Sequence, residues 1–119
     1  MAKILLIDDS PADIRFMTEV LRGQGHTVAS VSDPAQAEQA VSAENPGLIL
    51  LDVVMPNRNG YEVLRGIKRQ FPNPTFKVIF VSSKGSETDI KWGLRQGAAD
   101  YIIKPYTPAD VQTVLRRHI

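Results

Sequence analysis

The sequence predicts an α/β fold: a doubly wound, five-stranded parallel sheet in the order 2-1-3-4-5 with five helices, of the flavodoxin-like type. Three observations favour this fold. Five short apolar runs recur along the chain, segments with helix signals lie between them, and the connections are short. Consecutive parallel strands need a crossover, which is usually a right-handed helical connection. Such alternation is typical of a sheet covered by helices on both faces.

Five apolar runs of strand length form the predicted sheet. Their apolarity is continuous rather than alternating, which indicates strands that are buried on both faces. The first, third and fourth runs show this pattern best. The runs are residues 4–7, 27–31, 48–51, 78–81 and 101–103.

A repeated four-residue signature predicts the beginning of three helices. In residues 10–13 (SPAD), serine supplies a capping hydroxyl, proline takes the first helical position, and aspartate stands where a capping box has its acid. Residues 33–36 (DPAQ) and 107–110 (TPAD) repeat this signature. We therefore expect a helix to follow each of these three sites.

The helix interiors and ends complete the alternation. Apolar residues recur at helical spacing in the first, third and last helical segments, and the second segment is rich in alanine. Glycine, asparagine or proline follows the first four segments, as is usual at helix C-termini. The apolar positions are Ile14, Met17 and Leu21 in the first segment, Val63, Leu64, Ile67 and Phe71 in the third, and Val111, Val114 and Leu115 in the last. The fourth helix is expected over residues 88–96. The first four helices are expected to end at Gly23 and Gly25, at Asn45-Pro46, at Pro72 and at Gly97.

The composition predicts one domain over residues 1–119 and argues against several classes of protein. The chain has room for one hydrophobic core and is too short for a second folded unit. Its net charge of +1 gives no reason to expect a nucleic acid or a membrane surface as a partner. The lack of cysteine excludes disulfides and thiolate chemistry. The start MAKILLIDD reaches acids too early for a secretion signal or a membrane span, so we expect a cytoplasmic protein.

Polar residues stand at the end of four of the five predicted strands. Ligands of doubly wound sheets bind at the carboxyl ends of the strands. In the order 2-1-3-4-5 the first and third strands are neighbours, so the acids that follow them should meet in space. The polar residues are Asp8 and Asp9 after the first strand, Asp52 after the third, Ser82 after the fourth, and Lys104-Pro105 after the fifth.

The three expected neighbours Asp8, Asp9 and Asp52 are all carboxylates, which repel one another. At about 4 Å, each like pair costs on the order of 4 kcal/mol at a near-surface effective dielectric, so the cluster needs a cation or must take up protons. A small set of oxygen ligands without His or Cys suits Mg²⁺ or Mn²⁺. Lys104 adds one further positive charge to the same edge of the sheet.

These motifs together resemble the receiver domains of two-component response regulators. Each motif alone is weak, but their order and their places at strand ends make the set specific, and it covers essentially the whole chain. The resemblance implies a stand-alone, phosphorylation-dependent signalling switch that depends on Mg²⁺. The motifs are Asp8-Asp9, the stretch 52–56 (DVVMP) with Gly60, Ser82, and Lys104-Pro105.

The resemblance implies roles for the residues of the acidic cluster. Asp52 would be the phosphoacceptor. Asp9 and Asp52 would bind Mg²⁺ together with the backbone carbonyl of Val54, and Asp8 would assist through water.

The resemblance also implies roles for the residues around a phosphoryl group. Lys104 would pair with the phosphate, next to a cis peptide bond to Pro105. Ser82 and the backbone of Ser83 would bind the phosphate as well. Ser82 and Tyr101 would be the switch pair, in which the hydroxyl moves toward the phosphoryl group and the aromatic ring turns into the space left behind.

The resemblance implies partners at both ends of the signal. A histidine kinase or a phosphotransfer domain would donate the phosphoryl group, and the domain would catalyse only its own phosphorylation and dephosphorylation. The output would be altered binding of a downstream protein by the fourth helix, the fifth strand and the fifth helix. Residues 82–105 also resemble single-domain receivers of pilus-driven twitching motility and related chemotaxis-like systems, and Trp92 in this stretch is either a packing residue or part of the partner surface.

Some positions depart from the usual family pattern. Ser82 replaces the commoner threonine, and Ser83 stands where alanine or glycine is usual. Val54 and Lys84 occupy positions that tune hydrolysis of the phosphoryl group in the family. Because apolar Val54 cannot orient a water, we predict slow self-dephosphorylation.

Three other functions remain open from the residues alone. A flavin or nucleotide carrier of the same fold would need a glycine-rich or hydroxyl-rich loop after the first strand, where this chain has acids that repel an anion. A hydrolase with an aspartyl-phosphate intermediate usually spaces its first two acids one residue apart. A pseudo-receiver would dock to partners without being phosphorylated, and the intact set of acids disfavours it.

Overall fold

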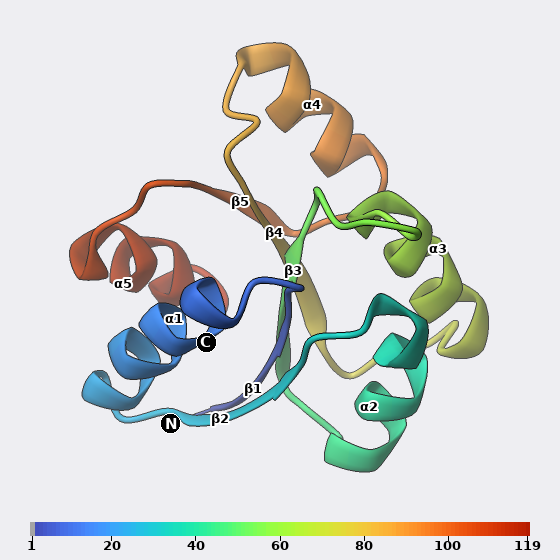
Figure 1. Cartoon of the computed structure of the whole chain (residues 1–119), viewed down its shortest axis with the longest axis horizontal. Helices are drawn as coiled ribbons and strands as arrows, with labels where there is room; N and C mark the ends of the chain where they lie inside the picture. The colour runs from blue at the N-terminus through green and yellow to red at the C-terminus, as the bar shows by residue number, and fades with distance from the viewer. Residues whose placement is uncertain (1) are drawn as a thin grey trace.

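The computed structural model describes residues 2–119 and contains one five-stranded sheet in the predicted order. All neighbouring strands are parallel, in the order β2-β1-β3-β4-β5. The α/β fold class and the strand order are therefore confirmed (Figure 1). The strands are β1 (Lys3–Ile7), β2 (Thr27–Val31), β3 (Leu48–Asp52), β4 (Lys77–Ser82) and β5 (Asp100–Ile103).

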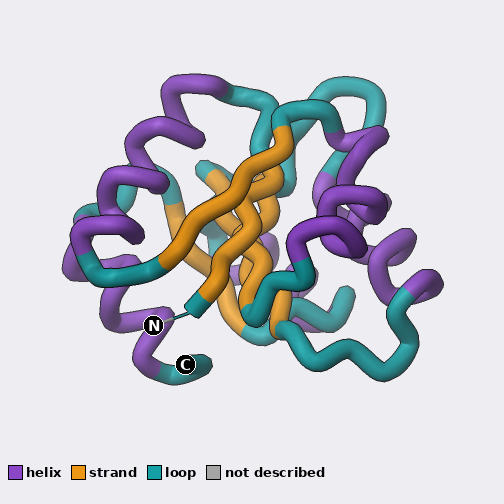
Figure 2. The backbone as a smooth tube through the Cα atoms, turned by 90° about the horizontal axis from the view of Figure 1, so that it is seen from below, coloured by secondary structure: helices purple, strands orange, loops and turns teal. Residues whose placement is uncertain are grey.

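Five α-helices cover the two faces of this sheet. Helices α1 and α5 lie together on one face, and α2 and α3 lie on the other (Figure 1). Figure 2 shows the strands as a central layer between the two sets of helices. The helices are α1 (Pro11–Gly23), α2 (Ala37–Glu44), α3 (Gly60–Gln70), α4 (Glu87–Arg95) and α5 (Pro108–Arg116).

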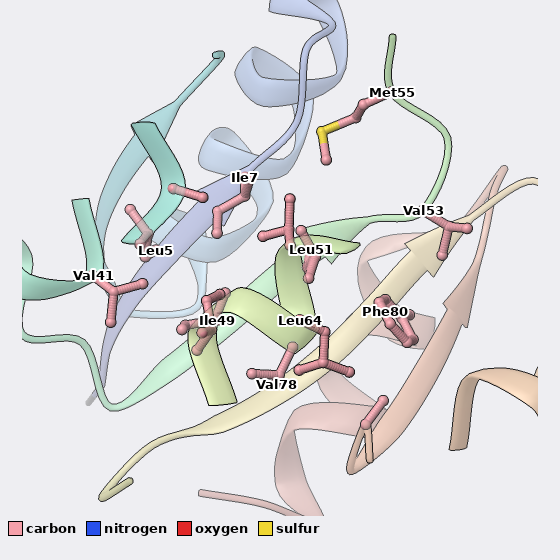
Figure 3. Packing of buried hydrophobic residues seen from close by; sticks show 14 of the residues in the cluster. Leu5, Ile7, Val41, Ile49, Leu51, Val53, Met55, Leu64, Val78 and Phe80 are labelled. Atoms are coloured by element: carbon pink, nitrogen blue, oxygen red, sulfur yellow. The ribbon is translucent and has the colours of Figure 1, made fainter. Parts of the chain in front are cut away.

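The hydrophobic core has two halves because successive strand residues point to opposite faces of the sheet. Alternate residues of β1 and β3 therefore enter different halves, which explains why their apolar runs are continuous. One half packs against α2 and α3, and Figure 3 shows Ile49 and Leu51 of β3 close to Leu64 of α3. The other half packs against α1 and α5 through residues that include Leu50, Leu21 and Val111. Burial on both faces holds the carboxyl ends of the central strands in fixed places.

The helix N-termini agree with the predicted signatures only in part. At α5 the side chain and backbone of Thr107 and Asp110 form the complete capping box that TPAD predicts. The DPAQ stretch forms a 3₁₀ turn (Pro34–Gln36), in which Asp33 accepts from the N–H of Ala35, and α2 begins only at Ala37.

The capping box expected at α1 is incomplete. Ser10 Oγ accepts from the N–H of Asp13 at 3.2 Å, but the Asp13 carboxylate does not return the bond and instead contacts Lys104. Complete capping boxes that were not predicted begin α3 and α4, at Asn59 with Glu62 and at Ser86 with Asp89. The fourth helix therefore begins slightly before the predicted residue 88.

Within residues 2–119, the helices are too short and too polar for any of them to cross a membrane.

Candidate functional site

The structure brings Asp8, Asp9 and Asp52 together at the carboxyl edge of the sheet. The register of β1 and β3 pairs Ile7 with Leu51, so the residues that follow each of these two lie side by side. One carboxylate oxygen from each of the three acids lies within 4.8 Å of the others. The spatial expectation drawn from the strand order is therefore met.

Burial and charge make Asp52 the most perturbed acid of this cluster. The residue is 6% exposed, and burial, followed by the negative charge of Asp8, raises its pKa to about 6 although Lys104 opposes the shift. Burial also raises the pKa of Asp8, against a hydrogen bond from the N–H of Ser10 and the charge of Lys104. Near neutral pH the cluster therefore carries concentrated negative charge at a largely buried place, which favours a bound cation.

The donor set fits a small divalent ion. It consists of three carboxylates, and hard oxygen ligands of this kind suit Mg²⁺ or Mn²⁺. The loop after β3 carries Val54, the residue expected to add its backbone carbonyl. That carbonyl accepts no backbone hydrogen bond within residues 2–119, and Val54 is 53% exposed. The three carboxylates and the Val54 carbonyl are therefore oxygen ligands of the kind that a magnesium site needs.

The ammonium of Lys104 lies among three carboxylates. Its Nζ is 2.8 Å from Asp13 Oδ2, 3.1 Å from Asp8 Oδ2 and 3.4 Å from Asp52 Oδ1. Burial disfavours the charged ammonium, but the hydrogen bond to Asp13 and the charges of Asp52 and Asp8 outweigh it and raise the pKa of Lys104. The Lys104–Pro105 peptide bond is cis. A protonated lysine therefore stands directly beside the predicted phosphoacceptor.

Ser82 and Tyr101 are linked through the backbone of one residue. Ser82 ends β4, is fully buried, and accepts a hydrogen bond of 3.1 Å at Oγ from the N–H of Lys84. The hydroxyl of Tyr101 donates to the carbonyl of Lys84 at 2.6 Å. Tyr101 is 7% exposed, so it is more deeply buried than a surface aromatic residue. The centroid of its ring lies 6.3 Å from that of Phe80. Ser83, expected to offer its backbone to a phosphate, follows in the exposed loop.

A close backbone approach holds the loop after β3 against the strand. The N–H of Gly60 donates to the carbonyl of Val53 at 2.8 Å. A Cβ atom at Gly60 would overlap the carbonyl oxygen of Asp52 and lie 2.8 Å from Val53 Cα. Glycine is therefore needed at this position for the loop to return beside the predicted phosphoacceptor.

Two features of the site and its loop were not predicted from the sequence. Asp13 was expected to cap α1, whereas it is the nearest partner of Lys104. Arg58, in the loop after β3, donates to Glu38 Oε1 of α2 at 2.6 Å and to the carbonyl of Pro34 at 3.0 Å. No local sequence signal marks either pair, because the partners come from different elements of the fold.

Comparisons with known proteins agree with this geometry. The family model described as "Response regulator receiver domain" matches residues 4–116. Protein PilH of Pseudomonas aeruginosa is 37% identical over 116 residues, which cover 98% of this chain and 93% of PilH. The DNA-binding response regulator MtrA of Mycolicibacterium smegmatis is 34% identical over 117 residues, and there the match covers 98% of this chain but only 50% of MtrA.

Solved structures show the same fold. The BeF3-activated N-terminal receiver domain of Klebsiella pneumoniae RstA has a TM-score of 0.87 at 28% identity, covering 98% of this chain and 97% of that one. The chemotaxis protein CheY4 of Vibrio cholerae has a TM-score of 0.90 at 24% identity, with coverage of 100% and 99%, and supports the fold alone. With a family model that spans residues 4–116 and an acidic cluster in the place that the fold predicts, this chain belongs to the family of response regulator receiver domains.

Proposed function

We propose that this receiver domain accepts a phosphoryl group on Asp52 and passes the signal on through a changed protein-binding surface. The observation that carries the proposal is the meeting of Asp8, Asp9 and Asp52 beside the ammonium of Lys104. A carboxylate is a weak nucleophile, so its use here depends on position and on the charges around it. The domain acts as a signalling module that promotes only its own phosphorylation and dephosphorylation.

The proposed reaction transfers the phosphoryl group from a phosphohistidine of a histidine kinase or phosphotransfer domain. An oxygen of Asp52 attacks phosphorus and forms the P–O bond of an acyl phosphate, while the P–N bond to the imidazole breaks. The leaving imidazole keeps the electron pair of that bond and takes up a proton. The side chain of Asp52 must be ionised to attack, and its pKa of about 6 leaves it mostly ionised at neutral pH.

Asp9 and Asp52, with the Val54 carbonyl and with Asp8 through water, would hold Mg²⁺ or Mn²⁺. A divalent ion supplies positive charge that offsets the negative charge of the transferring group. The chain's own contribution is to hold these oxygens at the ends of two neighbouring buried strands, where the geometry does not depend on a flexible loop alone.

Lys104, Ser82 and Ser83 would bind the phosphoryl oxygens. Phosphorylation takes the charge at Asp52 from −1 to roughly −2, which strengthens the attraction to the ammonium 3.4 Å away. The Ser82 hydroxyl already accepts from Lys84, so its own proton is available to donate to a phosphoryl oxygen. These contacts differ between the two states, which is the condition for a population shift.

The switch would act through Tyr101 and the surface formed by α4, β5 and α5. Both helices contact β5, which is one of the two edge strands of the sheet. Trp92 of α4 is 50% exposed and Ile103 of β5 is 42% exposed, which supports a protein-binding role for this surface. A movement of Ser82 toward the phosphate would release the loop that the Tyr101 hydroxyl now holds.

We further propose that residues 1–119 act in the cytoplasm as one stand-alone receiver, whose target is another protein rather than a nucleic acid or a membrane. The similarity to PilH over nearly the full length of both chains supports this reading, together with the likeness of residues 82–105 to receivers of twitching-motility and chemotaxis-like systems. Apolar Val54, exposed beside the site, supports slow self-dephosphorylation.

The test is incubation of the protein with Mg²⁺ and a small-molecule phosphodonor, followed by intact-mass measurement. We expect one phosphoryl adduct on the wild type and none on Asp52→Asn, which keeps the shape of the side chain but removes the nucleophile. The adduct should also fail to form when Mg²⁺ is chelated. Equal labelling of both proteins would contradict the assignment of Asp52, and no labelling of either would favour a pseudo-receiver that only docks.

A further inference from the structure

We propose that Asp13 is a positioning residue that draws the ammonium of Lys104 away from Asp52 and so weakens the hold of the lysine on an anionic group bound there. This inference rests on the proposed function, because it concerns the same site. It assigns a role to Asp13, which belongs neither to the acidic cluster nor to the residues proposed to bind the phosphate.

The distances around Lys104 carry the inference. Of its three carboxylate partners, the nearest is Asp13 at 2.8 Å, and the farthest is Asp52 at 3.4 Å. Asp13 lies outside the group of acids that could share a metal ion. The strongest contact of the lysine is therefore made to a carboxylate with no place in the metal cluster.

The start of α1 explains why Asp13 is available to the lysine. At α3, α4 and α5 the acid at the third helical position accepts a hydrogen bond from the N–H of the capping residue. At α1 the N–H of the capping residue, Ser10, donates to Asp8 Oδ1 at 2.9 Å instead. Asp8 thus performs the capping role that Asp13 would otherwise have, and the Asp13 carboxylate turns to Lys104. The three complete boxes pair Asn59 with Glu62, Ser86 with Asp89 and Thr107 with Asp110.

Competition between Asp13 and Asp52 follows from this arrangement. When the ammonium of Lys104 moves toward Asp52, its contact with Asp13 must lengthen. The Asp13 side chain is 45% exposed, so water can solvate it when the lysine moves toward a phosphoryl group. Because the bond to Asp13 is then weakened, it favours the form of the domain without an anion on Asp52.

The test measures the affinity for beryllofluoride, a non-covalent mimic of a phosphoryl group, at saturating Mg²⁺. We compare the wild type with Asp13→Asn, Lys104→Gln and the double variant. Asp13→Asn should bind beryllofluoride roughly two to five times more tightly, the size expected of a partly exposed ion pair. In the Lys104→Gln background, titrated to higher beryllofluoride, the same change should have no effect, because the residue through which Asp13 acts is gone.

Asp110→Asn is the matched control. Asp110 occupies the same helical position in α5, but its carboxylate accepts from the N–H of Thr107 rather than from Lys104. This variant should leave the beryllofluoride affinity unchanged. Thermal unfolding of each variant verifies that all of them are folded at the temperature of the titration.

Two results for Asp13→Asn would overturn the inference. An unchanged affinity shows that Asp13 does not restrain the lysine. An equal gain in the wild-type and Lys104→Gln backgrounds shows that Asp13 acts only through its charge. If the wild type itself binds no beryllofluoride, both this inference and the proposed function fail. If the wild type binds and Asp13→Asn binds equally well, only this inference fails.

Discussion

The hydroxyl of Tyr101 and the backbone carbonyl of Lys84 are joined by a hydrogen bond of 2.6 Å. The N–H of Lys84 donates to Ser82 Oγ at 3.1 Å, so one residue connects both members of the predicted switch pair. The loop after β4 is therefore held from two sides, by a strand residue next to the site and by an aromatic residue of β5. A change at either side chain should reach the other through this loop.

Replacing Tyr101 by phenylalanine tests the bond to the loop. The ring and its packing against Phe80 remain, and only the hydroxyl is lost. We expect the free energy of unfolding to fall by about 1 kcal/mol, the usual net worth of one hydrogen bond. Amide hydrogen exchange of residues 83–86 should become faster, because the loop loses one of its two anchors.

Tyr106→Phe is the matched control for this experiment. The Tyr106 hydroxyl forms no hydrogen bond within residues 2–119, and its pKa is raised to about 12 chiefly by burial. Its removal should change stability by less than about 0.5 kcal/mol. An equal effect of the two substitutions would show that the bond of Tyr101 to Lys84 contributes nothing of its own.

Asp52→Asn should stabilise the metal-free protein above pH 6. The pKa of Asp52 is raised from 3.8 to about 6, so ionisation of the folded protein costs more than ionisation of the unfolded chain. This cost is absent below about pH 4, grows as the pH rises to about 6, and is constant above that. We expect the variant to gain about 2 to 3 kcal/mol at pH 8 and almost nothing at pH 4, as measured by urea unfolding.

Mg²⁺ should reverse this order. The ion needs the ionised carboxylate, so it should stabilise the wild type and leave the variant largely unchanged. Its affinity for the wild type should also fall as the pH drops through 6, because protons compete for Asp52. A stability gain of Asp52→Asn that is the same at pH 4 and pH 8 would show that charge is not its cause.

Sequence patterns predicted those parts of the molecule that depend on local chemistry. The buried strands appear as continuous apolar runs because both of their faces are covered, and the strand order then places Asp8 next to Asp52. Local patterns do not predict the partner of a residue where a tertiary contact competes with a local one. Asp13 has the spacing of a helix cap, yet it pairs with Lys104, 91 positions away. A local window contains nothing that decides between these two partners.

The start of the second helix shows a different limit. DPAQ has a capping residue and a proline in the expected places, but Asp33 accepts from the N–H of Ala35, one residue too early for the predicted box. The chain therefore makes a 3₁₀ turn before α2 begins at Ala37. The pairing of Arg58 with Glu38 was equally beyond a local analysis, because it depends on α2 and the loop after β3 lying side by side.

Glu38→Gln should weaken the attachment of the loop after β3 to α2. The side chains of Glu38 and Arg58 are only 21% and 25% exposed, and the hydrogen bond from Arg58 lowers the pKa of Glu38. The stabilisation is present above the ordinary pKa of 4.5 and is lost as the pH falls through the lower folded-state value. We expect the variant to lose about 1 to 2 kcal/mol at pH 7 and to approach the wild type once the pH is low enough to protonate Glu38 in the folded protein.

The ion pair of Lys3 with Glu44 offers a comparison on the surface. These side chains are 42% and 40% exposed at a distance of 3.1 Å. Glu44→Gln should change the free energy of unfolding by less than about 0.5 kcal/mol, because water screens exposed pairs. Equal losses for Glu38→Gln and Glu44→Gln would mean that burial of the Arg58 pair adds nothing to its strength.

Gly60→Ala should damage both the fold and the metal site. The new Cβ would overlap the carbonyl oxygen of Asp52 and lie 2.8 Å from Val53 Cα, so backbone rather than a flexible side chain must move. Overpacking of this kind costs about 1 to 3 kcal/mol. Because the strain falls on the residue that carries the proposed nucleophile, we expect the Mg²⁺ affinity of the folded variant to fall as well, as measured by calorimetry.

Gly23, at the last position of α1, is the matched control, because no atom lies within 4 Å of such a Cβ there. Gly23→Ala should raise stability by up to about 1 kcal/mol and leave Mg²⁺ binding unchanged. If Gly60→Ala were as well tolerated as Gly23→Ala, the close approach of the loop to Asp52 would not be what holds the site in place.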